Sequence, residues 1–155
     1  MKSYLKNYTS EVPAANSLAS IEALLVRFGA TRIARQYRAQ TIVAMQFELP
    51  LESKPVMVKL PANVEIVLET LWTNYVAGLR GSAKREKEDF RPQAERTAWK
   101  LVRDWVEVQL SMAQTSQAAP LGIFLPYVWD GRRTFYEHVV ERGFKGMLAE
   151  KSEGG

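Results

Sequence analysis

The chain has 155 residues, 46% of them hydrophobic and 25% charged, which suits one globular domain with a single core and excludes a disordered chain. It contains no cysteine, which excludes disulfides, thiol catalysis and cysteine-bound zinc, and no apolar run reaches the ~18–20 residues of a membrane span, so we expect a cytoplasmic protein with no membrane partner. The net charge of +4 is mild but concentrated, because the first 38 residues hold six basic and two acidic side chains while the remainder holds fifteen of each.

An arm and a helix are predicted first. Residues 1–16 contain Pro13 and show no helical period, which predicts an extended arm. From Ser17 to Phe28, apolar side chains recur at steps of three and four, as on one side of a helix. Gly29 is expected to end this helix, because glycine tolerates the left-handed turn that terminates helices.

Three strands are predicted next, at residues 31–38, 41–49 and 56–60. One face of the second strand is expected to be buried; it is formed by Val43, Met45, Phe47 and Leu49. The intervening Ala39-Gln40 pair lacks the Asn or Gly that positive φ angles prefer, so the hairpin geometry stays open. Short links between successive strands predict an antiparallel meander.

The chain then turns to helices. Pro61-Ala-Asn63 begins one of them, with Glu65 and Glu69 near its positive end. Residues 80–90 are charged and poor in apolar side chains, which predicts a mobile loop. The longest helix is predicted from Pro92 to Thr115. Its main apolar stripe is Ala94, Ala98, Leu101, Trp105, Val108 and Met112, widened by Trp99, Val102, Val106 and Leu110.

The segment at 124–137, FLPYVWDGRRTFYE, combines five aromatic rings with two adjacent arginines. Asp130-Gly131 indicates a turn, and Thr134 with Glu137 forms the pattern of a capping box before a short helix that ends near Gly143. Helical spacing assigns most of the rings to the core. Arg132 and Arg133 are left exposed with no structural role, so we keep them as candidate phosphate ligands.

Catalytic and metal-binding patterns are absent from the sequence. His138 is the single histidine, and the three aspartates, Asp89, Asp104 and Asp130, lie in different segments without the spacing of a metal site. No glycine-rich phosphate loop and no nucleophile elbow is present. We therefore assign no catalytic residue, no metal ligand and no cofactor.

A series of basic residues remains as the candidate binding site: Arg27, Arg32, Arg35 and Arg38, together with Tyr37. Guanidinium groups match phosphate oxygens, and a neighbouring ring can stack on a base. The structural alternative is that charge on an edge strand discourages aggregation. Strand alternation also places Arg35 opposite to Arg32 and Arg38, so these three form one patch only if a bulge intervenes.

Several segments carry a family likeness: Asn7–Pro13, Leu60–Glu65, Gln93–Lys100 with Asp104–Gln109, and Phe124–Gly131. In their order they resemble a family of uncharacterised small proteins encoded by bacteriophages, prophages and other mobile elements. The resemblance covers most of residues 4–145, and the loop at 80–90 falls where members of that family vary. It implies a phage or mobile-element origin and supplies no catalytic residues.

The sequence therefore predicts an α+β domain at 17–145 with a flexible tail at 146–155. An N-terminal helix would precede a three-stranded antiparallel meander, followed by three or four helices packed on one sheet face. The favoured function is a non-enzymatic accessory protein that binds single- or double-stranded nucleic acid through the basic sheet region. The alternative is a protein-interaction or inhibitor module that acts on a host defence or replication factor, or sequesters a nucleotide signal. Trp72 or Trp129, if exposed, would suit contacts in a homo-oligomer.

Overall fold

The computed structural model describes residues 5–51, 54–82 and 84–146, and these form the predicted α+β fold. The helices and strands are α1 (Ala14–Phe28), β1 (Arg32–Arg38), β2 (Thr41–Leu51), β3 (Lys54–Lys59), α2 (Val64–Ala77), η1 (Lys87–Phe90), α3 (Arg91–Gln114), α4 (Pro120–Phe124), η2 (Leu125–Tyr127) and α5 (Phe135–Glu141). The three strands pair antiparallel in chain order, which confirms the predicted meander after an N-terminal helix.

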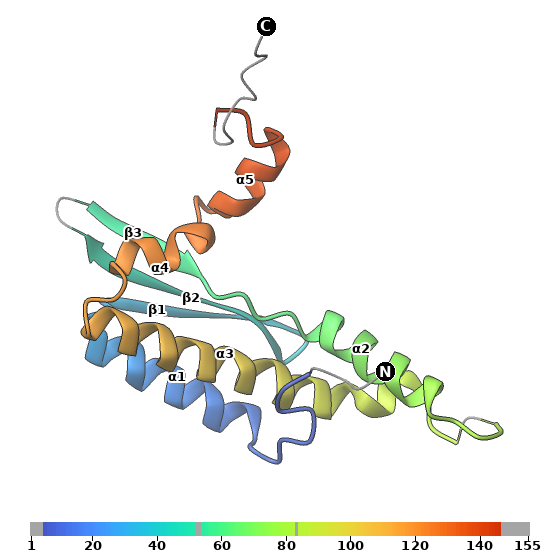
Figure 1. Ribbon diagram of the computed structural model, residues 1–155. Helices are drawn as coiled ribbons and strands as arrows, with labels where there is room; N and C mark the ends of the chain where they lie inside the picture. The colour runs from blue at the N-terminus through green and yellow to red at the C-terminus, as the bar shows by residue number, and fades with distance from the viewer. Residues whose placement is uncertain (1–4, 52–53, 83, 147–155) are drawn as a thin grey trace, which may run out of the picture.

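The main core lies between one face of the sheet and helices α1, α3 and α4. Figure 1 shows α1 and α3 running side by side along that face. Phe47 of β2 is fully buried, and its ring meets the Phe124 ring of α4 edge-on, with 5.2 Å between centroids. Buried side chains of α1 and α3 complete this core: Leu18, Ile21, Leu25, Trp99, Val102, Val106 and Leu110. Apolar burial of ~25 cal/mol per Å² stabilises the fold on this side of the sheet.

The predicted apolar stripe of α3 is right in part. Ala94 and Ala98 of the main stripe are buried, and so are the four side chains expected to widen it, with Trp99 and Val106 fully buried. Val108, predicted in the main stripe, is instead 57% exposed. Trp105 is partly buried because its ring packs edge-on against Phe124 and Tyr127 from the α4–η2 segment. Spacing alone could not distinguish two overlapping stripes of similar hydrophobicity.

Helix α2 begins after Asn63, whose side-chain oxygen accepts a hydrogen bond of 3.2 Å from the backbone N–H of Ile66. Figure 1 shows α2 beyond the end of the sheet, alongside the first half of α3. There it forms a second, smaller core of Leu68, Leu71 and Ala94. The chain thus has a sheet end and an α2 end, each with its own apolar cluster.

A bulge interrupts the alternation of β2. The register pairs Gln36 with Ala44 and Tyr37 with Ile42, so Val43 has no partner on β1. As a result Ile42 is buried in the main core and Val43 is 36% exposed. The prediction that Val43 shares the buried face with Met45 is therefore wrong, because one extra residue shifts the phase of a strand.

The N-terminal arm is shorter than predicted, since α1 begins at Ala14 directly after Pro13. Residues 5–13 form turns that lie against α3 instead of extending. The Thr97 hydroxyl donates a hydrogen bond of 2.9 Å to the carbonyl oxygen of Asn7, and the Gln93 amide donates one of 3.1 Å to that of Ser10. The first four residues of the predicted arm lie outside the described residues.

The predicted loop at 80–90 contains the short helix η1, which the sequence analysis did not predict. Reciprocal bonds between Glu86 and Asp89 cap this helix, and the Arg85 guanidinium lies 4.3 Å from the centroid of the Phe90 ring. Farther along, the Thr134–Glu137 capping box is present at the start of α5, as predicted. The predicted tail at 146–155 lies, apart from Gly146, outside the described residues.

Candidate nucleic-acid interface

Helices α1, α3 and α4 all pack on one face of the sheet and leave the opposite face uncovered; we call this opposite side the open face. The register arranges its side chains in cross-strand rows: Arg32, Glu48 and Met57 form one row, and Ala34, Gln46 and Lys59 form the next. Gln36 and Arg38 continue the same side of β1, because its alternation is unbroken. The Arg32 side chain is 80% exposed, and Arg38 is also exposed.

The charge of the open face is positive. Arg32, Arg38 and Lys59 contribute three cations, and Glu48 is the one acidic side chain that the register places among them. Its carboxylate is only 17% exposed; it accepts a hydrogen bond from the Thr31 hydroxyl and lies 4.0 Å from Nε of Arg32. Glu48 is therefore engaged within the protein, and the remaining positive charge faces outward.

An aromatic ring extends the open face beyond β3. The backbone N–H of Trp129 donates a hydrogen bond of 2.9 Å to the carbonyl oxygen of Met57, and Val128 bridges antiparallel to Val58. The ring centroid of Trp129 lies 5.9 Å from Nζ of Lys59. Sequence reasoning missed Lys59 and treated Trp129 only as an oligomer contact. Continuing the alternation through β3 would have found Lys59, whereas the pairing of Trp129 with β3 is a tertiary contact with no sequence signal.

Arg35 and Tyr37 do not belong to the open face. The bulge inserts its extra residue into β2 and leaves β1 regular, so Arg35 points toward α1. There its guanidinium lies 2.7 Å from a carboxylate oxygen of Glu22. Partial burial lowers the pKa of Arg35, but hydrogen bonds to Tyr37 and Glu22 outweigh burial and raise the pKa above its ordinary value. The structure thus divides the arginine series between two faces.

Arg27 lies apart from the sheet residues. It belongs to α1, which covers the other face, and it lines a shallow hollow of about 430 Å³ between α1 and α3 together with Glu107 and Gln114. Among the described residues it has no ion-pair partner. It therefore cannot act on the same ligand surface as Arg32 and Arg38 without a partner that reaches around the sheet edge.

Arg132 and Arg133 sit on the turn that follows Trp129. Their backbone N–H groups each donate a hydrogen bond of 2.8 Å to one oxygen of Asp130, and His138 Nε2 lies 2.7 Å from the other oxygen. The two backbone bonds and the His138 contact hold the pKa of Asp130 well below its usual range. The Arg133 guanidinium pairs with Glu141, whereas the Arg132 side chain is exposed and has no such partner in the described part of the chain.

The described residues contain neither a metal-binding cluster nor a membrane-spanning helix. No group of three or more His, Asp or Glu side chains within them is arranged to hold a metal ion. None of the helices in those ranges has the length and apolar character needed to cross a membrane. Comparisons of the chain with protein-family models, with curated proteins and with solved structures found no match.

Proposed function

We propose that this chain is a non-enzymatic protein that binds nucleic acid on the open face of its sheet. The observation that carries the proposal is that Arg32, Arg38, Lys59 and the Trp129 ring share one face of the sheet, which no described helix covers. Several convergent cations are what phosphate binding needs, because affinity for a polyanion comes from the counterions it releases. Arg35, Tyr37 and Arg27 are excluded from this surface by their positions.

A single strand suits the open face better than a duplex. Single-stranded nucleic acid is bound by a positive surface that follows the backbone and by aromatic rings on which bases stack. Trp129 supplies such a ring beside Lys59, and the exposed Gln36 supplies a hydrogen-bonding group on the same side of β1, whereas Gln46 is only 6% exposed. Arg132 is exposed on the turn that follows Trp129.

The origin of the chain is part of the same proposal. Its resemblance to small proteins of bacteriophages and other mobile elements favours an accessory role during infection or transfer. A protein that coats or delivers single-stranded nucleic acid would encounter it during replication of the mobile element. His138 lies on the surface in a pair with Asp130, and the proposal assigns it no catalytic role.

A binding titration with a matched charge control tests the proposal. We expect a labelled single-stranded oligonucleotide to bind the wild-type chain, and the triple variant Arg32→Gln, Arg38→Gln, Lys59→Gln to bind at least about tenfold more weakly. The dependence of log affinity on log salt should become shallower by about 2, because each phosphate contact on a single strand contributes ~0.7. The control variant Arg80→Gln, Lys84→Gln, Lys145→Gln removes the same charge from exposed positions elsewhere and should bind like wild type.

Stacking is tested separately at Trp129. Trp129→Ala should lose ~1–3 kcal/mol of binding free energy, whereas Trp129→Phe keeps a ring and should lose less. Absence of any oligonucleotide binding at low salt, or equal weakening by both triple variants, would overturn the proposed function. A duplex that binds as tightly as the single strand would overturn the preference for single strands.

A second candidate function, a protein-interaction module, is favoured by α5. Within the described chain α5 packs mainly against η2, and it buries none of its residues. Its exposed apolar side chains, with those of the segment that follows, are Phe135, Tyr136, Val140 and Phe144. Contiguous exposed rings are a feature of protein interfaces. Analytical ultracentrifugation of the wild type and of the double variant Tyr136→Ser, Phe144→Ser tests this candidate. A homo-oligomer held by these rings should dissociate in the variant, whereas a monomer should sediment alike in both.

A further inference from the structure

We propose that a groove at the α2 end of the molecule is a second binding site, for a nucleotide: a planar base joined to an anionic phosphate. The groove consists of two adjoining hollows of about 680 and 360 Å³, which share Glu11, Pro92 and Arg96. Ligand sites commonly enclose ~300–1,000 Å³. The groove lies between the N-terminal arm, α2 and the start of α3, and none of its lining residues belongs to the sheet or to the Trp129 segment. Figure 1 shows the arm and α2 well away from α5.

The walls of the groove are held in place without a ligand. The arm wall is anchored to α3 by the bonds from Thr97 and Gln93 to carbonyl oxygens of the arm. Farther up the arm, Lys6 and the Asn7 amide both bind the carboxylate of Asp104. A preformed site loses less conformational entropy on binding than one that must order itself.

Aromatic rings line the larger hollow on two sides. Tyr75 of α2 and Phe90 of η1 pack against each other with centroids 5.0 Å apart, which fixes the orientation of both rings. Across the hollow, Tyr8 of the arm is 52% exposed. This exposed ring suits a planar ligand inserted between the two walls.

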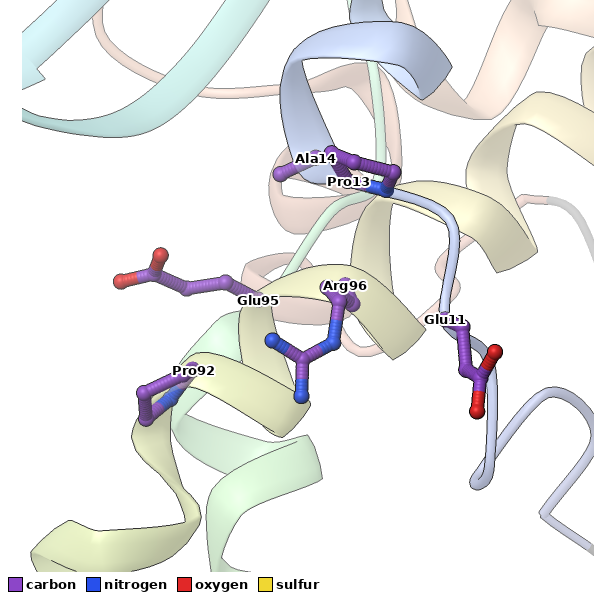
Figure 2. A pocket seen from close by; sticks show the side chains of 6 residues that line it. All are labelled: Glu11, Pro13, Ala14, Pro92, Glu95 and Arg96. Carbon is purple, nitrogen blue, oxygen red and sulfur yellow. The ribbon is translucent and has the colours of Figure 1, made fainter.

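Two arginines in the groove have no acidic partner among the described residues. The Arg85 guanidinium lies over the Phe90 ring, and the Arg96 guanidinium contacts only neutral acceptors, the Ser10 carbonyl and the Gln93 side chain. Figure 2 shows the Arg96 side chain projecting from α3 toward Pro92, with Glu11 of the arm on its other side. The neighbouring Arg91 differs, because Glu88 and Glu65 both bind it and raise its pKa above the ordinary value. Within the described residues, Arg85 and Arg96 thus remain available to an anion.

The acidic residues of the groove narrow the ligand class. Glu11 and Asp89 also line the larger hollow and Glu95 lines the smaller one, so the groove holds three carboxylates beside its two guanidinium groups, and a simple anion such as inorganic phosphate gains little there. A nucleotide presents both kinds of group, since its phosphate can bind guanidinium groups while ribose hydroxyls or base amines donate to carboxylates. The aromatic rings, guanidinium groups and carboxylates of the groove thus match the base, the phosphate and the ribose of a nucleotide.

Calorimetry on the full chain tests the inference with the four ribonucleoside 5′-monophosphates, and with inorganic phosphate and adenosine as partial ligands. We expect at least one nucleotide to bind, and to bind more tightly than phosphate or adenosine. Arg85→Gln and Tyr8→Ala, both at exposed positions, should each weaken binding about tenfold or more, the loss of one charge-assisted bond or one stacking contact. Arg142→Gln, at an exposed arginine just after α5 that lines neither hollow, should have no effect.

Three results would overturn the inference: no heat with any nucleotide at millimolar concentration, phosphate alone binding as well as nucleotides, or unchanged binding in both Arg85→Gln and Tyr8→Ala. Thermal unfolding of each variant shows whether it is folded. The Arg32→Gln, Arg38→Gln, Lys59→Gln variant keeps the groove and should bind mononucleotides like wild type. If this variant no longer binds mononucleotides, they bind at the open face and not in the groove. That result would overturn the groove as a second site and leave the proposed function standing.

Discussion

Alternate residues of the same strands lie on opposite faces of the sheet, where one set packs in the core and the other is proposed to bind a ligand. On the covered face Met45, Phe47 and Val58 have exposures of 1% or less. On the open face Lys59 follows Val58 along β3, and Arg32, whose side chain is 80% exposed, precedes Ile33 along β1. Because side chains of a strand alternate between faces, a single step along β1 or β3 moves from a residue that packs against the core to one available for a ligand.

The largest effect is expected from breaking the covered face. Phe47→Ala removes a fully buried ring that packs against Phe124, and it should lower the free energy of unfolding by ~3–5 kcal/mol, as large-to-small core changes do. Arg32→Ala, on the open face, should change it by less than ~0.5 kcal/mol. Urea unfolding of both variants checks the contrast. A loss below ~1 kcal/mol for Phe47→Ala would show that the core does not close over this ring.

The bulge offers a sharper form of the same comparison. Simple alternation places Val43 inside and Ile42 outside, whereas the structure reverses them. Ile42→Thr should therefore destabilise the fold by about 2 kcal/mol, through lost apolar burial and a buried hydroxyl. Val43→Thr keeps a β-branched side chain at an exposed position and should be neutral within ~0.5 kcal/mol. The opposite ranking in urea unfolding would mean that β2 runs without a bulge.

The reversal at Val43 also shows why the fold was easier to predict than its details. Element order followed from local signals: the apolar period of α1, the turn at Asp130-Gly131 and the cap at Thr134. The face on which each β2 side chain lies depends on one unpaired residue, Val43, and no residue type in the sequence marks a bulge there. The extent of the α3 stripe was uncertain for a related reason, because apolar residues cover much of this helix and only packing decides that Trp99 and Val106 are buried while Val108 is exposed.

The candidate site was predictable only in part. Alternation correctly separated Arg35 from Arg32 and Arg38, and the ion pair with Glu22 accounts for Arg35. Lys59 could have been found from β3, but Trp129 joins the open face only because its segment pairs with β3, some 70 residues away in the chain. Sites formed by such long-range contacts have no local signature, and the groove beside Arg96 is of the same kind.

An intermediate effect is expected at Asp104, which ties the arm to the helical layer over the covered face. Burial alone would raise the pKa of Asp104, but hydrogen bonds from Lys100, Lys6, Asn7 and Arg103 hold it well below its usual range. A lowered folded-state pKa contributes stability above the unfolded value of ~3.9, and this contribution is lost as the pH falls below it.

Asp104→Asn should therefore destabilise the chain by ~1–2 kcal/mol at neutral pH, and the difference from wild type should narrow below pH ~4. Urea unfolding at neutral and acid pH measures both quantities. Glu95→Gln provides the control, since Glu95 lies on the same helix and has no ion-pair partner in the described residues. A difference that stays constant with pH would mean that the carboxylate is not held by these donors.

The smallest effect on stability is expected at the turn that connects strands β1 and β2. Ala39 and Gln40 both have positive φ, 46° and 68°, the conformation in which Asn-Gly is strongly preferred. Gln40→Gly relieves the Cβ clash of the left-handed conformation and should stabilise the fold by ~0.5–1 kcal/mol, less the extra freedom that glycine has when unfolded. Because Arg38 keeps its place in the ladder opposite Thr41, oligonucleotide affinity should not change. If stability rises while affinity falls, the strained turn itself contributes to the open face, and the binding surface extends to the end of the hairpin.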